Sequence, residues 1–510
     1  MIRRTLLLVA GLLACSAKPN EGAMELTIRG DLPGSSIQPE IYGAFAEHLG
    51  SGVYDGLWVG KKSPIKNVGG IRSDVIDALK ALHLGVLRWP GGCFADQYHW
   101  RDGIGPQESR PKRLNVIWGG EESNEFGTHE FFKLCDLIGA KPYLAANVGS
   151  GTPMEMRDWL EYLTSDSNSA LANERRQNGQ ASPWKVPYLG IGNESWGCGG
   201  NMRAEYYADL YRQFATFAQS LSGNHVSKIA SGSSDDDYNW TETLMRQAGG
   251  HLDGLSLHHY SLPTGQWGTK GRATGFSEKE WYDTLRQALL METLIQRHGA
   301  IMDKYDAKKR VNLVVDEWGT WYDPDPSMKL GALSQPNTMR DAVVAAINLN
   351  LFNQHCDRVR MACMAQSVNV LQSLLLVKGN QVVKTPTYYV FDLFKQHEGS
   401  TLLPVEGQVP GADPIPNVSV SASKDASGSI LVTIANLNAT QPVRVNFHVA
   451  GPSMKSATGQ LLAGDTFRTG NDFNNPNAVV PRPLTGLSFK EGVLACDLPA
   501  ASVAAIRLEK

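Results

Sequence analysis

Residues 188–217 read YLGIGNESWGCGGNMRAEYYADLYRQFATF, and this stretch holds one complete strand-to-helix unit. The strand candidate Tyr188–Glu194 is apolar until its last residues, which are polar, and a glycine-rich turn follows it. The apolar face of an amphipathic helix comes next, at positions Tyr206, Tyr207, Leu210, Phe214 and Phe217. The stretch therefore predicts a buried strand, a polar turn and a helix that packs back onto the strand.

The same unit recurs along most of the chain. Between about residues 41 and 395, eight apolar or β-branched runs alternate with eight amphipathic stretches, several of which begin with helix-capping residues. The eight strand candidates are Ile41–His48, Gly85–Pro90, Lys141–Val148, Tyr188–Glu194, Lys228–Ser234, Gly254–Tyr260, Val311–Gly319 and Arg358–Gln366. Eight such units close most economically into a (β/α)₈ TIM barrel. A doubly wound open sheet is the alternative, but the glycine-rich nucleotide-binding turn that would support it is missing after the first strand.

The pattern changes after the eighth unit. From about residue 403, short alternating strands are separated by Gly, Pro, Asn and Asp, which predicts an appended C-terminal antiparallel β-sandwich. Met24–Arg29 is an isolated strand-like segment that could pair with this sandwich. We therefore expect an N-terminal strand segment at 24–38, a catalytic barrel at 39–398 and a sandwich at 399–510.

Composition limits the class of partner. The chain has 510 residues, 42% of them hydrophobic, and a formal net charge of −3 from 48 basic and 51 acidic side chains. These values are typical of a packed globular protein and exclude a disordered or coiled-coil chain. Since no basic block is present, a nucleic-acid surface is not expected, and the partner should be neutral or weakly charged.

The first 17 residues resemble an export signal. Arg3 and Arg4 precede the apolar run Leu6–Leu13, and small residues follow it. Cys15 also stands where a lipoprotein signal has its lipid-modified cysteine, so a membrane tether through Cys15 is possible. On this pattern we expect residues 1–17 to be a signal peptide and the protein to be exported, whether periplasmic, extracellular or lipid-anchored at the cell surface.

Seven cysteines are present, and none of them forms a C-x-x-C pair. A zinc ribbon or a thioredoxin-like motif is therefore not expected. A chain of this length can bury enough apolar surface without disulfides, so buried free thiols are the simplest expectation. Any pairing stays open at this point.

Two carboxylates stand out because each ends a run that is otherwise suited to complete burial. Glu194 follows the fourth strand candidate, and Glu317 follows Val311–Val315 in the seventh. In a TIM barrel, the residues at the carboxyl ends of the strands meet at the mouth of the barrel. Two carboxylates meeting there are the minimal equipment of a glycosidase, in which one protonates the departing oxygen and the other attacks the anomeric carbon. The alternative is that one or both form structural ion pairs with Arg88 or another cation.

Five motifs in sequence order resemble glycoside hydrolase family 51, which consists chiefly of α-L-arabinofuranosidases. They are Tyr42–Gly50, Arg88–Phe94 followed by Trp100–Pro106, Gly192–Gly200, Ser256–Tyr260 and Asp316–Tyr322. The resemblance runs from about residue 25 to the C-terminus. It implies a retaining exo-glycosidase without a metal or other cofactor, which releases terminal α-L-arabinofuranosyl residues from arabinoxylan, arabinan or their oligosaccharides, and which assembles as a homo-oligomer.

The resemblance also assigns residues by position. Glu194 becomes the acid/base and Glu317 the nucleophile. The implied substrate-binding or supporting residues are Glu47, Arg88, Cys93, Asn193, His258, Tyr260, Trp321 and Gln366. At Cys93 many relatives have Asn, and since a thiol is a weak donor, a steric role is the alternative there. His258 and His259 are not expected to bind a metal, because adjacent strand residues point to opposite faces.

Two other functions remain open on the sequence. The same fold could act on β-glucan or xylan, or the chain could be a surface glycan-binding lipoprotein without catalysis. Loss of a carboxylate would favour the binding protein, and this chain has both carboxylates.

Overall fold

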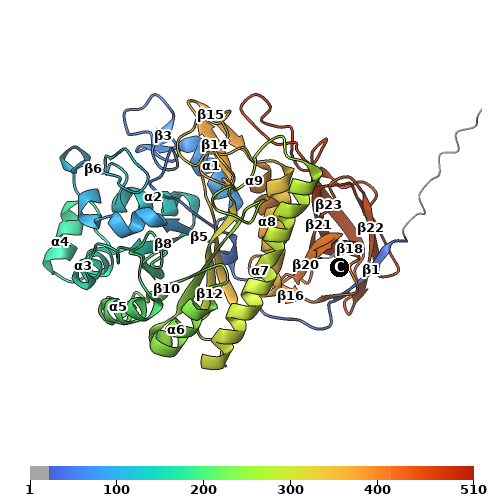
Figure 1. Ribbon diagram of the computed structural model, residues 1–510, viewed down its shortest axis with the longest axis horizontal. Helices are drawn as coiled ribbons and strands as arrows, with labels where there is room; N and C mark the ends of the chain where they lie inside the picture. Colours follow the sequence, from blue (N-terminus) through green and yellow to red (C-terminus); the bar gives the residue numbers. More distant parts are fainter. Residues whose placement is uncertain (1–21, 413) are drawn as a thin grey trace, which may run out of the picture.

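The computed structural model describes residues 22–412 and 414–510, and its centre is a closed eight-stranded parallel barrel (Figure 1). Residues 1–17, which the sequence predicted to be a signal peptide, lie outside the described residues, and Cys15 is among them. The barrel strands are β2 (Gly43–Phe45), β5 (Val86–Trp89), β8 (Lys141–Ala146), β9 (Tyr188–Ile191), β10 (Ser227–Ser234), β11 (Gly254–Ser261), β12 (Asn312–Thr320) and β13 (Val359–Met364). They pair in chain order, and β13 closes the cylinder onto β2. The predicted TIM barrel is confirmed.

Helices surround the barrel, and their starts follow the capping chemistry of the sequence. They are α1 (Ser73–Leu82), α2 (Thr128–Ile138), α3 (Pro153–Thr164), α4 (Ala170–Gln177), α5 (Ala204–Phe217), α6 (Tyr238–Ala248), α7 (Glu278–Tyr305), α8 (Met339–Gln354) and α9 (Pro386–Phe394). The side chain of Thr152 accepts a hydrogen bond at the start of α3, and Ser277 and Glu280 form a reciprocal capping box at α7. Helix α4 was not predicted, since only Ala172 and Arg175 of it are buried and its apolar pattern is weak.

The second unit is a sandwich of two sheets. The five-stranded sheet contains β17 (Val405–Glu406), β1 (Met24–Arg29), β22 (Val443–Ala450), β26 (Val493–Leu498) and β25 (Ser488–Lys490). The six-stranded sheet contains β16 (Thr401–Leu403), β20 (Val418–Lys424), β21 (Ile430–Asn436), β27 (Ser502–Glu509), β23 (Ser456–Ala463) and β24 (Arg482–Pro483). Strand β1 pairs in parallel with β22, so the blue start of the described chain lies among the red C-terminal strands in Figure 1.

Helix α8 joins the two units. Its residues Met339–Asn353 are all buried, because one side covers the barrel and the other packs on β20, β21 and β27. This explains why α8 is apolar nearly all round instead of amphipathic. Within the part of the chain that the structure describes, no helix is long and apolar enough to cross a membrane.

Two barrel strands have bounds that differ from those predicted from the sequence. The first candidate starts as a 3₁₀ turn, Pro39–Tyr42, and only Gly43–Phe45 joins the barrel. Strand β9 ends at Ile191, because Gly192 and Glu194 have φ angles of 82° and 40°, which an extended strand cannot continue. The polar residues after β9 therefore turn toward the barrel mouth instead of extending the sheet.

Candidate active site

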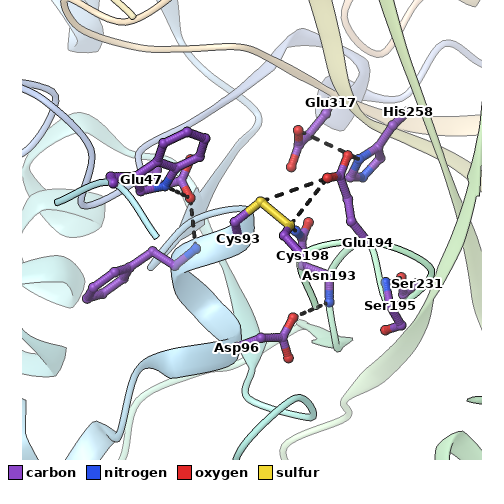
Figure 2. Close-up of a disulfide and its surroundings, with 12 residues drawn as sticks. Glu47, Cys93, Asp96, Asn193, Glu194, Ser195, Cys198, Ser231, His258 and Glu317 are labelled. Carbon is purple, nitrogen blue, oxygen red and sulfur yellow. Dashed lines mark hydrogen bonds and ion pairs between the residues drawn. A yellow bond between two sulfur atoms is a disulfide. The ribbon is translucent and has the colours of Figure 1, made fainter. Parts of the chain in front are cut away.

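A cavity of about 330 Å³ opens at the carboxyl ends of the barrel strands. Both candidate carboxylates line it, together with Glu47, Gly92, Cys93, Trp118, Trp196, Ser234, Tyr260, Trp267, Trp321, Gln366 and three leucines. Its size and its mixture of aromatic walls with a few converging polar groups fit a small ligand such as one sugar ring. Figure 2 shows the catalytic end of this cavity.

Glu317 on β12 is held from two sides on the cavity floor. The Arg88 guanidinium donates to Glu317 Oε1 at 2.9 Å, and the Tyr260 hydroxyl donates to Oε2 at 2.8 Å. Glu317 is only 5% exposed. A Cβ at position 92 would lie 2.8 Å from Glu317 Oε1, so Gly92 leaves room for the carboxylate in this position. The carboxylate of Glu317 is therefore ion-paired, oriented by two hydrogen bonds and part of the cavity lining.

Glu194 stands in the turn after β9 and lines the same cavity as Glu317. Its Oε1 is 2.9 Å from His258 Nδ1, whereas its Oε2 has only sulfur contacts and faces the cavity. Burial raises the pKa of Glu194 and the neighbouring charge of Glu317 raises it further, against the opposing hydrogen bond from His258. Glu194 is therefore suited to hold a proton that it can deliver from Oε2.

The two carboxylates converge. An oxygen of Glu194, an oxygen of Glu317 and a ring nitrogen of His258 lie within 4.8 Å of one another. So close an approach of the two carboxylates is compatible with a retaining glycosidase and leaves less room than the gap of about 6.5–9.5 Å in which an inverting enzyme holds a water molecule.

His258 connects the site to a buried aspartate. Its Nε2 lies 3.1 Å from Asp316 Oδ1, and Asp316 Oδ2 accepts a 2.7 Å hydrogen bond from the Tyr143 hydroxyl. Burial lowers the pKa of His258, but the charges of Glu317 and Asp316 and the bond to Glu194 raise it to about 10. The ring is thus an imidazolium that donates to a carboxylate on either side.

Glu47 forms the far wall of the cavity. Its Oε1 accepts hydrogen bonds of 2.9 Å from the Phe94 backbone and from the Trp118 indole, and Gln366 lies against its other oxygen. Burial, with a further contribution from Glu317, raises the pKa of Glu47 to about 7. Trp321 packs edge-on against Tyr260 and Trp267, so an aromatic corner faces these polar groups.

Cys93 and Cys198 form a disulfide, which corrects the expectation of free thiols at these positions (Figure 2). Cys93 follows β5 and Cys198 follows β9, so the barrel brings together two loops that are 105 residues apart in sequence. Their Sγ atoms lie 3.9 and 3.4 Å from Glu194 Oε2. A disulfide sulfur carries no proton, so these are packing contacts and Cys93 donates no hydrogen bond to a sugar. Cys135, Cys356, Cys363 and Cys496 are free and buried.

Two groups in the described residues bring potential metal ligands together. One is Cys93, Glu194 and Cys198, and the other is Glu194, His258 and Glu317. The disulfide leaves no thiolate in the first group. In the second, the ligand atoms already pair with one another and with Arg88, so neither group offers a free ligand set.

Seven of the ten residues assigned from the sequence line this cavity, namely Glu47, Cys93, Glu194, Tyr260, Glu317, Trp321 and Gln366. Arg88 and His258 do not line it but contact Glu317 and Glu194. Asn193 lies behind it, where its Oδ1 accepts a 2.6 Å hydrogen bond from Arg88 and its backbone N–H donates to Asp96. His259 points outward to Asp235 and the Gln287 carbonyl, opposite to His258, as the strand alternation predicted. Sequence reasoning missed the roles of Asp316, Tyr143 and Trp267, and it missed Cys198. The available signal for the disulfide was that one cysteine follows the second barrel strand, β5, and another follows the fourth, β9.

Comparisons with known proteins agree with this geometry. Residues 78–274 match the family described as "Alpha-L-arabinofuranosidase 1 domain", and residues 316–502 match "Alpha-L-arabinofuranosidase C-terminal domain". The chain is 47% identical to a Bacteroides ovatus protein named "Intracellular exo-alpha-L-arabinofuranosidase", with 100% of both chains covered. An alpha-L-arabinofuranosidase C of Emericella nidulans is 31% identical over 84% of this chain and 87% of its own.

Solved structures give the same relationship. The GH51 arabinofuranosidase of Xanthomonas axonopodis pv. citri superposes with a TM-score of 0.93 at 48% identity, covering 96% of this chain and 100% of that one. An alpha-L-arabinofuranosidase from Thermotoga maritima, solved as an arabinose complex, gives a TM-score of 0.85 at 29% identity with the same coverage.

The expectation of export is wrong on these comparisons. The Bacteroides ovatus relative matches over the whole length of both chains and is named intracellular. Two arginines before eight apolar residues form a short pattern with little information, so it could not decide the compartment. The proposed lipid tether through Cys15 depended on export and is withdrawn with it.

Proposed function

The chain belongs to the α-L-arabinofuranosidases of glycoside hydrolase family 51, and from this premise we propose that it releases terminal, non-reducing α-L-arabinofuranosyl residues by a retaining double displacement. The observation that carries the proposal is the convergence of Glu194 and Glu317 on one cavity, with carboxylate oxygens within 4.8 Å. Because a relative that matches the whole chain is named intracellular, we place this enzyme inside the cell, where its substrates are arabinose-containing oligosaccharides. Assembly into a homo-oligomer stays a prediction.

In the first step, Glu317 attacks the anomeric carbon of the bound arabinofuranose. Arg88 and Tyr260 hold both carboxylate oxygens in place. Glu194 donates its proton from Oε2 to the glycosidic oxygen, so the aglycone leaves as a neutral alcohol and a glycosyl ester on Glu317 remains. The raised pKa of Glu194 keeps this proton available near neutral pH.

In the second step, Glu194 acts as the base. Once the ester forms, Glu317 no longer carries a negative charge, so one cause of the raised pKa of Glu194 is removed and its carboxylate is stabilised beside the His258 imidazolium. It takes a proton from the water that attacks the anomeric carbon. The sugar is released with its original anomeric configuration.

The remaining polar groups hold the furanose. Arg88 occupies Asn193 Oδ1, so only the Asn193 Nδ2 group is left to reach a sugar hydroxyl next to the reacting carbon. Glu47, Gln366 and Trp118 form a hydrogen-bonded part of the cavity wall. Trp321 supplies an apolar face for the ring. A small cavity of this kind encloses one terminal sugar and so favours exo action.

The test compares three aryl glycosides: the α-L-arabinofuranoside, the β-glucoside and the β-xyloside. We expect the enzyme to hydrolyse only the arabinofuranoside. NMR should show that the α anomer of the released arabinose is formed first. A first-formed β anomer would overturn the double displacement, and faster hydrolysis of the glucoside or xyloside would overturn the assigned sugar. The solved xyloglucanase and glucanase-xylanase that superpose on this chain are only 11% and 12% identical and indicate the fold alone.

A further inference from the structure

We propose that the Cys93–Cys198 disulfide is a positioning element for the acid/base carboxylate, and that its reduction by a low-molecular-weight thiol slows cleavage of the glycosidic bond. The proposal rests on the function proposed above for Glu194. It adds a redox dependence to a site whose chemistry is otherwise only acid–base and nucleophilic.

The disulfide is the wall against which Glu194 Oε2 packs (Figure 2). Glu194 lies four residues before Cys198 in a tight turn and has a φ of 40°, an unfavourable value for a side chain other than glycine. Backbone hydrogen bonds from Gly197 and Gly199 to the Glu194 carbonyl close this turn. The disulfide then fixes the turn to the loop after β5, so it orients the oxygen that delivers the proton.

Reduction would change the chemistry beside that oxygen. Two thiol molecules supply two electrons and two protons, Cys93 and Cys198 become thiols, and the reductant leaves as its own disulfide. At the observed separations of 3.4 and 3.9 Å, an S–H group can donate to Glu194 Oε2. Such a bond stabilises the ionised carboxylate and opposes the protonated form that the first step needs.

The other charged and titratable groups that face Glu194 come from three strands. They are Arg88 on β5, His258 and Tyr260 on β11, and Glu317 on β12. None of them changes its covalent state on reduction, so an effect that depends on reductant is due to the cysteine pair. The effect of reduction on activity is relevant for an enzyme inside the cell, because thiol reductants are abundant there.

The experiment measures kcat/KM against pH for the oxidised and the thiol-reduced enzyme, using an arabinoside with a poor leaving group. Mass spectrometry after alkylation of the native protein reports how many thiols are accessible. Reduction is expected to expose two, to lower kcat/KM about ten-fold and to move the alkaline limb to lower pH. The double variant Cys93→Ala/Cys198→Ala, still joined through Asp96 and Asn193, should be slower than the oxidised enzyme and insensitive to reductant.

Each outcome is decisive. An unchanged rate and pH profile after complete reduction would overturn the proposal. Sensitivity of the double variant to reductant would also overturn it, because the effect would then come from another group. If the oxidised enzyme does not cleave arabinofuranosides at all, the proposed function fails instead, and the two failures are therefore distinguishable.

A different observation carries a second inference. A cavity of about 340 Å³ adjoins the catalytic cavity and shares Tyr260 and Trp267 with it. Ser234 lines the catalytic cavity on the Glu194 side, and the next two residues, Asp235 and Asp236, line this second cavity. We infer that it binds the leaving saccharide, a neutral oligosaccharide chain attached to the arabinose, which again rests on the proposed function.

The lining of this groove suits a neutral sugar chain. Trp267 and Leu290 of α7 are 48% and 43% exposed and offer apolar faces. Asp235, Asp236 and Arg297 contribute charges of both signs, and Asp235 is already paired with His259. The Arg297 guanidinium lies 5.5 Å from the centre of the Tyr238 ring. Opposite charges beside aromatic rings can bind hydroxyl groups by charge-assisted hydrogen bonds without favouring an ionic ligand.

The test uses two variants of the groove: Arg297→Ala removes a polar contact, and Thr293→Trp fills the groove. Gln296→Ala on the same helix is the matched control. KM for an arabinotetraose should rise about five-fold in Arg297→Ala, as expected for one lost hydrogen bond. It should rise by at least as much in Thr293→Trp, whose indole occupies the groove. The rate on an aryl arabinofuranoside should stay constant. Equal effects on both substrates, or no effect of Thr293→Trp on the tetraose, would overturn the inference. If the unmodified enzyme does not hydrolyse the aryl arabinofuranoside at all, the proposed function fails instead.

Discussion

The imidazole Nδ1 of His258 lies 2.9 Å from Oε1 of Glu194, so one oxygen of the acid/base is permanently occupied and the other is left for the substrate. The same nitrogen is 3.6 Å from Glu317 Oε2. A single cation therefore serves both catalytic carboxylates. As the negative charge moves from Glu317 in the first step to Glu194 in the second, the imidazolium can stabilise it in either place without reorganising.

Replacing His258 with Gln should shift the pH dependence. The substitution removes the positive charge beside Glu194, and so it raises the pKa of that carboxyl further above its ordinary value. The alkaline limb of kcat/KM, which reports the protonated acid, should move to higher pH. At neutral pH kcat should fall about ten-fold, because the base of the second step is less ionised. His259→Gln on the opposite face of β11 is the control, and a shift of the same size in that variant would contradict this argument.

Glu317→Ala should abolish turnover on every substrate, by about 10⁵-fold or more, because no other group can form the glycosyl ester. Glu317→Gln retains the packing against Arg88 and Tyr260 and should be equally inactive. Steady-state hydrolysis of an aryl arabinofuranoside measures both. Substantial activity in the Gln variant would remove Glu317 from the nucleophile's role.

Glu194→Ala should be selective. An activated aryl leaving group needs no proton, so the glycosyl-enzyme should still form and accumulate as a burst, whereas natural oligosaccharides should not react. Azide can enter the space left by the carboxylate and attack the glycosyl-enzyme in place of water. It should restore turnover and give the α-arabinofuranosyl azide, which has the anomeric configuration of the substrate. Equal loss on both substrate classes, with no azide effect, would reject the assigned acid/base.

The sequence predicted the barrel and the catalytic pair because both follow from local patterns. Apolar runs mark the strands, and a carboxylate at the end of an otherwise buried run, such as Glu194 or Glu317, is costly unless it has a function. The strand ends were less predictable. Pro39–Tyr42 forms a 3₁₀ turn where the apolar pattern alone indicated a strand.

Features that depend on contacts between distant segments could not be read in this way. The disulfide joins loops that approach only once the barrel closes. Asp316 gains its role from the register of β11 against β12, which pairs His258 with the next residue, Glu317, and leaves Asp316 Oδ1 3.1 Å from His258 Nε2. Trp118 and Trp267 come from long connections whose course no periodicity encodes. The prediction of export was wrong because it depended on a short N-terminal sequence pattern and not on packed structure.

Gly92→Ala should reduce kcat/KM by about 10²-fold with little loss of stability. The added Cβ would lie 2.8 Å from Glu317 Oε1, so the carboxylate must move away from its position against Arg88, and a displacement of this kind at a nucleophile is expensive. Gly299→Ala in α7, where nothing lies within 4 Å of the new Cβ, is the control. Thermal unfolding separates the two effects: a large drop in Tm with unchanged activity per folded molecule would contradict the prediction.

Glu47→Gln should change how stability depends on pH. Burial and the charge of Glu317 raise the pKa of Glu47 from 4.5 to about 7 in the folded protein. Between these two values the folded state holds a proton that the unfolded state has lost, so the free energy of unfolding falls as pH rises from about 4.5 to 7 and changes no further above 7. A Gln side chain cannot ionise, which removes this contribution of about 3 kcal/mol. Urea unfolding at pH 5 and pH 8 should therefore show a smaller decrease in the variant than in the unmodified enzyme. Parallel pH profiles for the two proteins would mean that Glu47 is ionised throughout and binds the sugar as a carboxylate.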